Sequence, residues 1–94
     1  MNKDEARKLL VQELRKYRSK TYTELTAMLG NQGCWEVTSL AGITYQVEVD
    51  IFWDGPTGGD VRVSGSIDDG RLLASLKPLT EDFIMTPAGT FVGK

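Results

Sequence analysis

The feature that most constrains this chain is a run of alternating apolar and polar residues in its middle. The apolar positions of the first run are Tyr45, Val47, Val49, Ile51 and Trp53. A period of two over this length predicts a strand with one buried face. Beyond the glycine-rich loop 54–60, a second alternating run places on one face Val61, Val63, Gly65 and Ile67. The stretch therefore predicts an antiparallel hairpin.

The shared apolar face also predicts how the two strands pair, because a slip by one residue would turn valines toward serine or arginine. Setting Trp53 opposite Val61 makes every later inward pair apolar, or apolar against glycine. Those pairs are Ile51 with Val63, Val49 with Gly65, and Val47 with Ile67. We therefore predict this register for the hairpin.

The dipeptide Asp69-Gly70 favours a two-residue type I′ turn, because glycine adopts positive φ at little cost. Such a turn predicts a third strand, with the pairs Ile67–Leu72, Gly65–Ala74 and Val63–Leu76. Gly65 beside Ala74 would leave a shallow place where a helix can approach closely or an aromatic ring can fit. The segment RLLASLK (71–77) also contains good helix formers, so strand and helix both stay open for it.

Two helices are predicted before the sheet. Residues 3–18 follow a capping residue, Asn2, with Glu5 three positions later in a capping-box-like arrangement. Their apolar stripe consists of Ala6, Leu9, Leu10, Leu14 and Tyr17. Residues 21–29 form a second, short helix that begins with a capping box of Thr21 and Glu24 and ends at Gly30.

The remaining elements are predicted from shorter signals. Residues 34–40 form the first strand, and a three-residue loop, 41–43, sets Val37 against Val47 and Trp35 against Val49. Residues 79–83 resemble one helical turn, and residues 90–92 form an edge strand or a docked tail.

Taken together, these elements predict a single α+β domain over residues 1–94, with a helical segment (1–30) and a sheet with a C-terminal tail (34–94). One long and one short N-terminal helix pack on one face of a four- or five-stranded antiparallel meander.

Three motifs resemble a small family of uncharacterised bacterial α+β proteins with no assigned function. They are YQVEVDIFWDG (45–55), GSIDDG (65–70) and PLTEDFIMTPAGTFVG (78–93). The resemblance covers residues 44–94 firmly and the helices loosely. Family members carry a second glycine and an aromatic residue after the Asp-Asp-Gly turn, where this chain has Arg71 and Leu72. The resemblance implies a fold and no particular chemistry.

Charge is divided unevenly along the chain. Residues 1–20 hold seven Lys/Arg and three Asp/Glu, whereas residues 21–94 hold four and ten, and the net charge is −2. The single cysteine, Cys34, excludes an internal disulfide, and we expect a buried structural thiol. No apolar run is long enough for a membrane span, and we expect a cytoplasmic protein.

Catalysis is not predicted, because the chain has no histidine and no motif for a catalytic, metal or cofactor site. Glu48 and Asp50 share the polar face of the central strand and offer an alternative, a divalent-metal-dependent hydrolase. The aspartates of the two turns, 54–60 and 68–69, are expected to cap their own backbone rather than to bind Ca²⁺.

A second alternative is nucleic-acid binding through the basic N-terminal helix, which is disfavoured because the polar sheet face offers few aromatic rings for base stacking. The leading prediction is a small non-catalytic interaction module with a protein partner. Its interaction face consists of Gln46, Glu48, Asp50, Phe52 and Arg62, in which Phe52 and Arg62 are expected to form a cation–π pair. The oligomeric state is not predicted.

Overall fold

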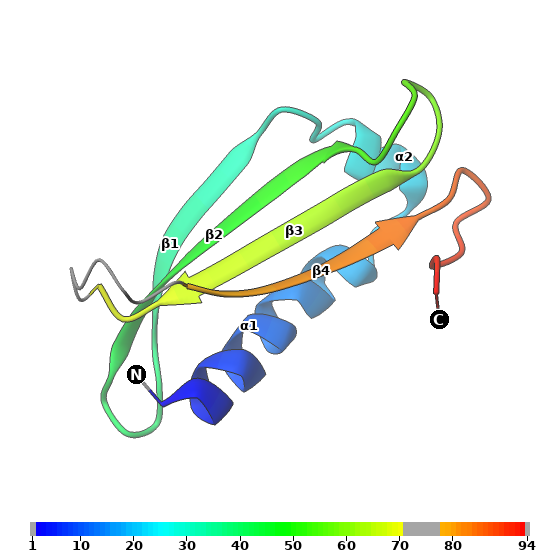
Figure 1. Cartoon of the computed structure of the whole chain (residues 1–94). Coiled ribbons are helices and arrows are strands. Elements are labelled where there is room, and N and C mark those ends of the chain that lie inside the picture. Colours follow the sequence, from blue (N-terminus) through cyan, green and yellow to red (C-terminus); the bar gives the residue numbers. More distant parts are fainter. Residues whose placement is uncertain (1, 71–77, 94) are drawn as a thin grey trace.

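The computed structural model describes residues 2–70 and 78–93, and it shows an α+β fold (Figure 1). Two helices come first, α1 (Lys3–Arg18) and α2 (Tyr22–Thr26). The strands that follow are β1 (Gln32–Thr38), β2 (Thr44–Trp53), β3 (Val61–Asp68) and β4 (Leu79–Met85). They form one antiparallel sheet in the order β1-β2-β3-β4, and α1 runs along one face of it.

Helix α1 has the bounds that its sequence predicts. The Asn2 side chain caps it by accepting a hydrogen bond from the Glu5 backbone N–H at 3.1 Å. The Glu5 carboxylate instead accepts the Tyr45 hydroxyl of β2 at 2.9 Å, so this residue ties the start of the helix to the sheet. The predicted stripe faces the sheet, and its fully buried members are Ala6, Leu10 and Leu14.

Helix α2 is shorter than the predicted 21–29 because turns replace the helix after Thr26. Both hydrogen bonds of the predicted capping box between Thr21 and Glu24 are present. Gly30 has a φ of +80°, as expected for the residue that ends this segment.

The central hairpin has the predicted register. Trp53 faces Val61, and the following inward pairs are Ile51 with Val63, Val49 with Gly65, and Val47 with Ile67. Burial alternates along β2 and β3, and the inward side chains between Tyr45 and Ile67 form the core with α1. Matching apolar faces therefore suffice to pair these two strands.

Gly65 provides the place where α1 meets the sheet. A Cβ atom at this position would lie 3.0 Å from Leu10 Cδ1 and 3.0 Å from Leu14 Cδ2. The predicted close approach of a helix to this glycine is thus confirmed. The absent side chain allows two leucines to reach the backbone of β3.

The predicted partner of β3 is wrong. Leu79 lies opposite Ile67 and Phe83 opposite Val63, so the strand beside β3 is β4 and not residues 71–76. The predicted helical turn at 79–83 is wrong for the same reason. The alternation in β4 is concealed by Glu81, an inward residue opposite Gly65. Residues 71–77, for which strand and helix were both open, lie outside the described residues.

Strand β1 is displaced from its predicted position. It spans Gln32–Thr38 rather than 34–40, and Val37 faces Tyr45 while Trp35 faces Val47. The predicted register is wrong by two residues, because a five-residue connection replaces the three-residue loop. The Ser39 N–H donates to Ile43 O at 2.8 Å, and Gly42 has a φ of +83°. A shift of two keeps the same face inward.

The prediction of a buried Cys34 is also wrong, since the thiol is exposed. Cys34 lies opposite Glu48 in the register of β1 and β2, on the face that points away from α1.

The C-terminal segment docks on β4, as one of the two predicted alternatives states. Phe91 forms an isolated antiparallel bridge with Met85, and the Val92 N–H donates to Ile84 O at 2.9 Å. The Phe91 ring packs edge to face against the Phe83 ring, with 5.6 Å between the ring centres. The Arg18 guanidinium lies 4.7 Å from the centre of the Phe83 ring.

We expect Gly65→Val to lower the free energy of unfolding by roughly 1–3 kcal/mol, because the added methyl groups would displace Leu10 and Leu14 from a packed core. Gly55→Ala is the matched control, since nothing lies within 4 Å of a Cβ atom at Gly55. Urea unfolding followed by circular dichroism measures both variants. A Gly65→Val variant as stable as the control would contradict the close approach of α1.

Candidate functional site

The candidate site is the face of the sheet that points away from α1, which we call the outer face. It alternates with the buried face along every strand. The four predicted residues of β2 all lie exposed on it, namely Gln46, Glu48, Asp50 and Phe52. Phe52 retains 44% of its accessible surface, which is high for a phenylalanine in the middle of a sheet. The structure therefore brings these residues together on an open surface.

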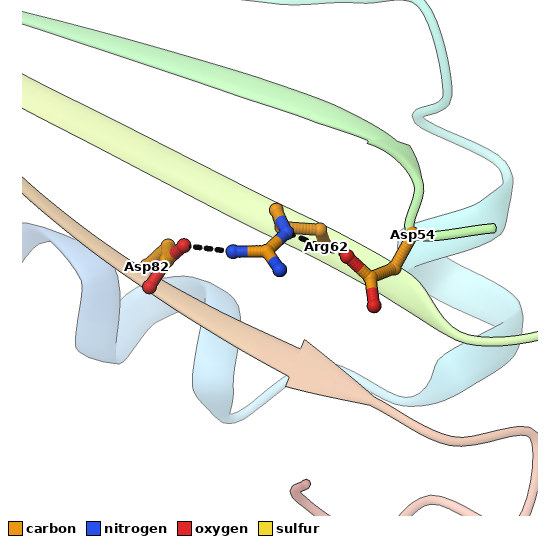
Figure 2. A network of polar contacts seen from close by, with 3 residues as sticks. All are labelled: Asp54, Arg62 and Asp82. Atoms are coloured by element: carbon orange, nitrogen blue, oxygen red, sulfur yellow. Dashed lines mark hydrogen bonds and ion pairs between the residues drawn. The ribbon is translucent and has the colours of Figure 1, made fainter.

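The fifth predicted residue, Arg62, lies opposite Phe52 on β3 and is held by two carboxylates (Figure 2). Its Nε donates to Asp54 Oδ1 at 2.7 Å, and its Nη1 donates to Asp82 Oδ2. The hydrogen bond with Asp54 is the main reason why the pKa of Arg62 is raised above its ordinary value. Arg62 thus links the end of β2 to β4 across β3.

The predicted cation–π pair of Arg62 with Phe52 is not what the structure shows. The guanidinium is directed at the two carboxylates, although the two residues are cross-strand neighbours. Within residues 2–70 and 78–93, the arginine that contacts aromatic rings is Arg18, which lies on Phe83 and Phe91.

The outer face is strongly acidic. Among the described strand residues, its only basic side chain is Arg62, whose charge is offset by Asp54 and Asp82. Its acidic residues are Glu36, Glu48, Asp50, Asp68 and Asp82. Half of the ten acidic residues in segment 21–94 thus lie on this one surface.

The carboxylates on this face are spread rather than clustered. Glu48 and Asp50 are two residues apart on one strand, a backbone separation of about 7 Å. Asp50 and Asp82 are separated by Ser64 on the strand between them, which corresponds to about 9.5 Å. A single cation needs its oxygen ligands within about 2.6 Å. In the part of the chain that the structure describes, no group of three or more His, Cys, Asp or Glu residues could hold a metal ion.

The turn aspartates have local roles. Asp68 Oδ1 accepts the Gly70 N–H at 2.8 Å, which is the backbone capping predicted for this turn. For Asp54 the prediction is wrong, because its carboxylate pairs with Arg62, while its own N–H donates to Asp60 O at 2.9 Å.

The basic face of α1 is partly used within the molecule. Arg7 pairs with Glu81 at 2.5 Å, which neutralises the inward carboxylate of β4. Lys16 pairs with Glu13 at 2.5 Å, and Arg18 lies against two phenylalanine rings. Six basic residues in and just after this helix are candidates for a phosphate contact. Arg7, Lys16 and Arg18 therefore have partners within the molecule, and the other three are Lys8, Arg15 and Lys20.

Sequence reasoning missed Glu13, which is not part of the predicted apolar stripe of the helix. This residue is only 7% exposed, and its Oε1 accepts the Trp35 Nε1–H at 3.0 Å. Burial alone would raise the pKa of Glu13, but the hydrogen bonds from Lys16 and Trp35 lower it overall. Its spacing could have revealed it, because Glu13 lies three residues after Leu10 and four before Tyr17.

Comparison with protein family models, with curated proteins and with solved structures found no match. The family resemblance drawn from the three motifs accordingly stays a prediction. Within the described residues, no helix combines the length and the apolar character needed to cross a membrane.

We expect Glu13→Gln to destabilise the protein by roughly 1–2 kcal/mol at neutral pH, because hydrogen bonds to a charged group contribute more than those to an amide. Because the pKa of Glu13 is lowered in the folded protein, its charge stabilises the fold at pH values above 4.5, the ordinary pKa of a glutamate. This contribution is lost as the pH falls through the lowered pKa. The difference between wild type and variant should therefore shrink below pH 4.5.

Urea unfolding at a series of pH values measures this difference. Glu48→Gln, the same change at an exposed position, should stay within about 0.5 kcal/mol of wild type. A Glu13→Gln effect that persists unchanged in acid would show that the carboxylate charge is not involved.

Proposed function

We propose that this protein is a non-catalytic interaction module whose outer face binds a basic segment of a partner protein. The observation that carries the proposal is the combination of exposed carboxylates with an exposed phenylalanine on a rigid sheet. Glu48, Asp50 and Phe52 occupy alternate positions of β2, so all three project from the same side of one strand.

The spacing of the carboxylates supports a basic partner rather than a metal ion. Neighbouring acidic residues of the outer face are about 7–10 Å apart, as strand geometry sets. Such gaps suit separate lysine or arginine side chains, each contacting its own carboxylate. The metal-dependent hydrolase that uses Glu48 and Asp50 receives less support, because these two carboxylates belong to no group of three or more possible ligands in the described part of the chain.

Phe52 supplies the apolar contact that a purely electrostatic surface would lack. Aromatic residues dominate the binding energy of many interfaces, because they bury a large area with few rotatable bonds. Arg62 is half-buried beside Phe52 and is fixed by Asp54 and Asp82. It therefore does not compete with a cationic partner for the other carboxylates of the outer face, and its side chain does not need to change position on binding. Cross-strand pairing also places Ile84 next to Arg62 on the outer face of β4.

Nucleic-acid binding receives less support. The outer face would repel phosphates, and half of the basic residues proposed for α1 already contact Glu81, Glu13 or phenylalanine rings.

The test is a titration of ¹⁵N-labelled protein with a lysine- and arginine-rich peptide that contains one leucine, followed by amide chemical shifts. We expect shifts centred on residues 46–52, weaker binding at higher salt, and no binding of the same peptide with glutamate in place of its basic residues. Each surface ion pair is worth about 0.2–1 kcal/mol, so Glu48→Gln with Asp50→Asn should weaken binding several-fold.

Two single variants make the comparison sharper. Asp50→Asn should weaken binding, whereas Asp4→Asn removes the same charge from the exposed start of α1 and should not. Phe52→Ala should also weaken binding without weakening its salt dependence. Equal affinity for the Asp50→Asn and Asp4→Asn variants would contradict the proposal, because it would place the peptide elsewhere or show unspecific attraction.

A further inference from the structure

The two edge strands of the sheet, β1 and β4, differ in whether another described segment pairs with them. At the β4 edge, the C-terminal segment pairs with the last two residues of the strand, through the bridge between Met85 and Phe91 and the hydrogen bond from Val92 to Ile84. The other edge is β1, and the described part of the chain places no strand beside it. Natural edge strands are usually blunted by proline, lysine or a bulge. The sequence of β1, QGCWEVT, has neither proline nor lysine.

The hydrogen bonding of the β1–β2 hairpin shows which backbone groups face this open edge. The Ser39 N–H points toward β2, where it donates to Ile43 O. Residues of an antiparallel pair alternate between groups that point to the partner and groups that point away. The residues of β1 that turn their N–H and C=O outward are therefore Gln32, Cys34, Glu36 and Thr38.

The inner face of β1 is also incompletely covered. Helix α1 packs on β3 and β4, and the inward residues of β1, Trp35 and Val37, stay only half-buried. Leu40, the second residue after this strand, is fully exposed. An open row of backbone groups thus lies next to apolar side chains that lack complete cover.

We propose that the β1 edge pairs with β1 of a second copy of this chain, antiparallel about a two-fold axis at Trp35, which extends the sheet across both copies. In this register Trp35 faces Trp35, Gly33 faces Val37, Cys34 faces Glu36, and Gln32 faces Thr38. Apolar residues meet on the inner face and polar residues meet on the outer face.

The strand is self-complementary in this register and less so in its neighbours. A two-fold axis at Trp35 pairs all seven residues of β1 and matches the outward backbone groups of one copy with those of the other. A shift of the axis to Glu36 would set two glutamates opposite each other, which is unfavourable. A shift to Cys34 would pair Val37 with Asn31 beyond the strand. These comparisons favour a second copy over an unrelated strand.

The first test is the mass in solution, measured by light scattering after size exclusion over a range of concentrations. We expect a concentration-dependent rise from 10.4 kDa toward twice that value. Glu36→Pro should abolish the rise in mass, because the Glu36 N–H faces the open edge. Proline at this position removes a hydrogen-bond donor of the proposed pairing but leaves the hydrogen bonds between β1 and β2 intact. Circular dichroism should show that this variant stays folded.

The second test reads the register through the only cysteine of the chain. In a Glu36→Cys variant, the introduced thiol lies opposite Cys34 of the second copy, at a separation that a disulfide can span. Mild oxidation should give a covalent dimer. Thr38→Cys is the matched control on the same strand, and its new thiol lies opposite Gln32, so it should cross-link far less.

The outcomes separate clearly. A constant mass of one chain at all concentrations would overturn the proposal, as would a folded Glu36→Pro variant that still dimerises. Cross-linking of Thr38→Cys in preference to Glu36→Cys would overturn the register. None of these results depends on whether the outer face binds a basic peptide.

Discussion

The close contact between α1 and Gly65 is the constraint on which the rest of this structure depends. Two leucines one helical turn apart reach the backbone of β3 because this position has no side chain. The same contact brings Arg7 to Glu81, so that the inward carboxylate of β4 is neutralised by the helix. Glu13 meets Trp35 in a similar way on the side of β1. The helix therefore satisfies polar groups on both sides of its apolar stripe.

The position of the helix also decides which surfaces are left for function. The long helix α1 packs on β3 and β4, and within residues 2–70 and 78–93 no element covers the opposite face of the sheet or pairs with the edge at β1. The charged residues of the outer face are mainly acidic, whereas those of α1 are mainly basic. Arg62 is a basic residue on this acidic face, and two carboxylates, Asp54 and Asp82, offset its charge and hold it in place (Figure 2). The proposed partner segment and the proposed second copy use two different open surfaces.

The sequence predicts the parts of this fold in which local pattern and burial agree. The register of β2 with β3 follows from two apolar faces that match at every inward position, and α1 follows from its cap and stripe. The place of β4 could not be derived this way, because its inward Glu81 interrupts the alternation and becomes acceptable only beside Arg7 of a distant helix. The Asp69-Gly70 dipeptide led to a wrong strand partner for β3, because it reports only on local turn geometry. The strand that pairs with β3 begins farther along the chain, at Leu79.

The residues of the candidate site could be predicted from the sequence, but the ion pairs that they form could not. Parity along β2 placed Glu48, Asp50 and Phe52 together, yet the pairing of Arg62 with Asp82 required the position of β4. Cys34 lies on the outer face in both the predicted and the observed register of β1, so its exposure follows from the alternation of the strand and not from the shift.

The seating of α1 on Gly65 can be measured directly by nuclear Overhauser effects in the folded protein. The structure predicts strong cross-peaks between the Gly65 α-protons and methyl groups of both Leu10 and Leu14. Cross-peaks from the Gly65 α-protons to neither leucine, in a protein whose β2–β3 cross-peaks match the register described above, would contradict the account. The sheet would then stand, but the helix would cover a different part of it.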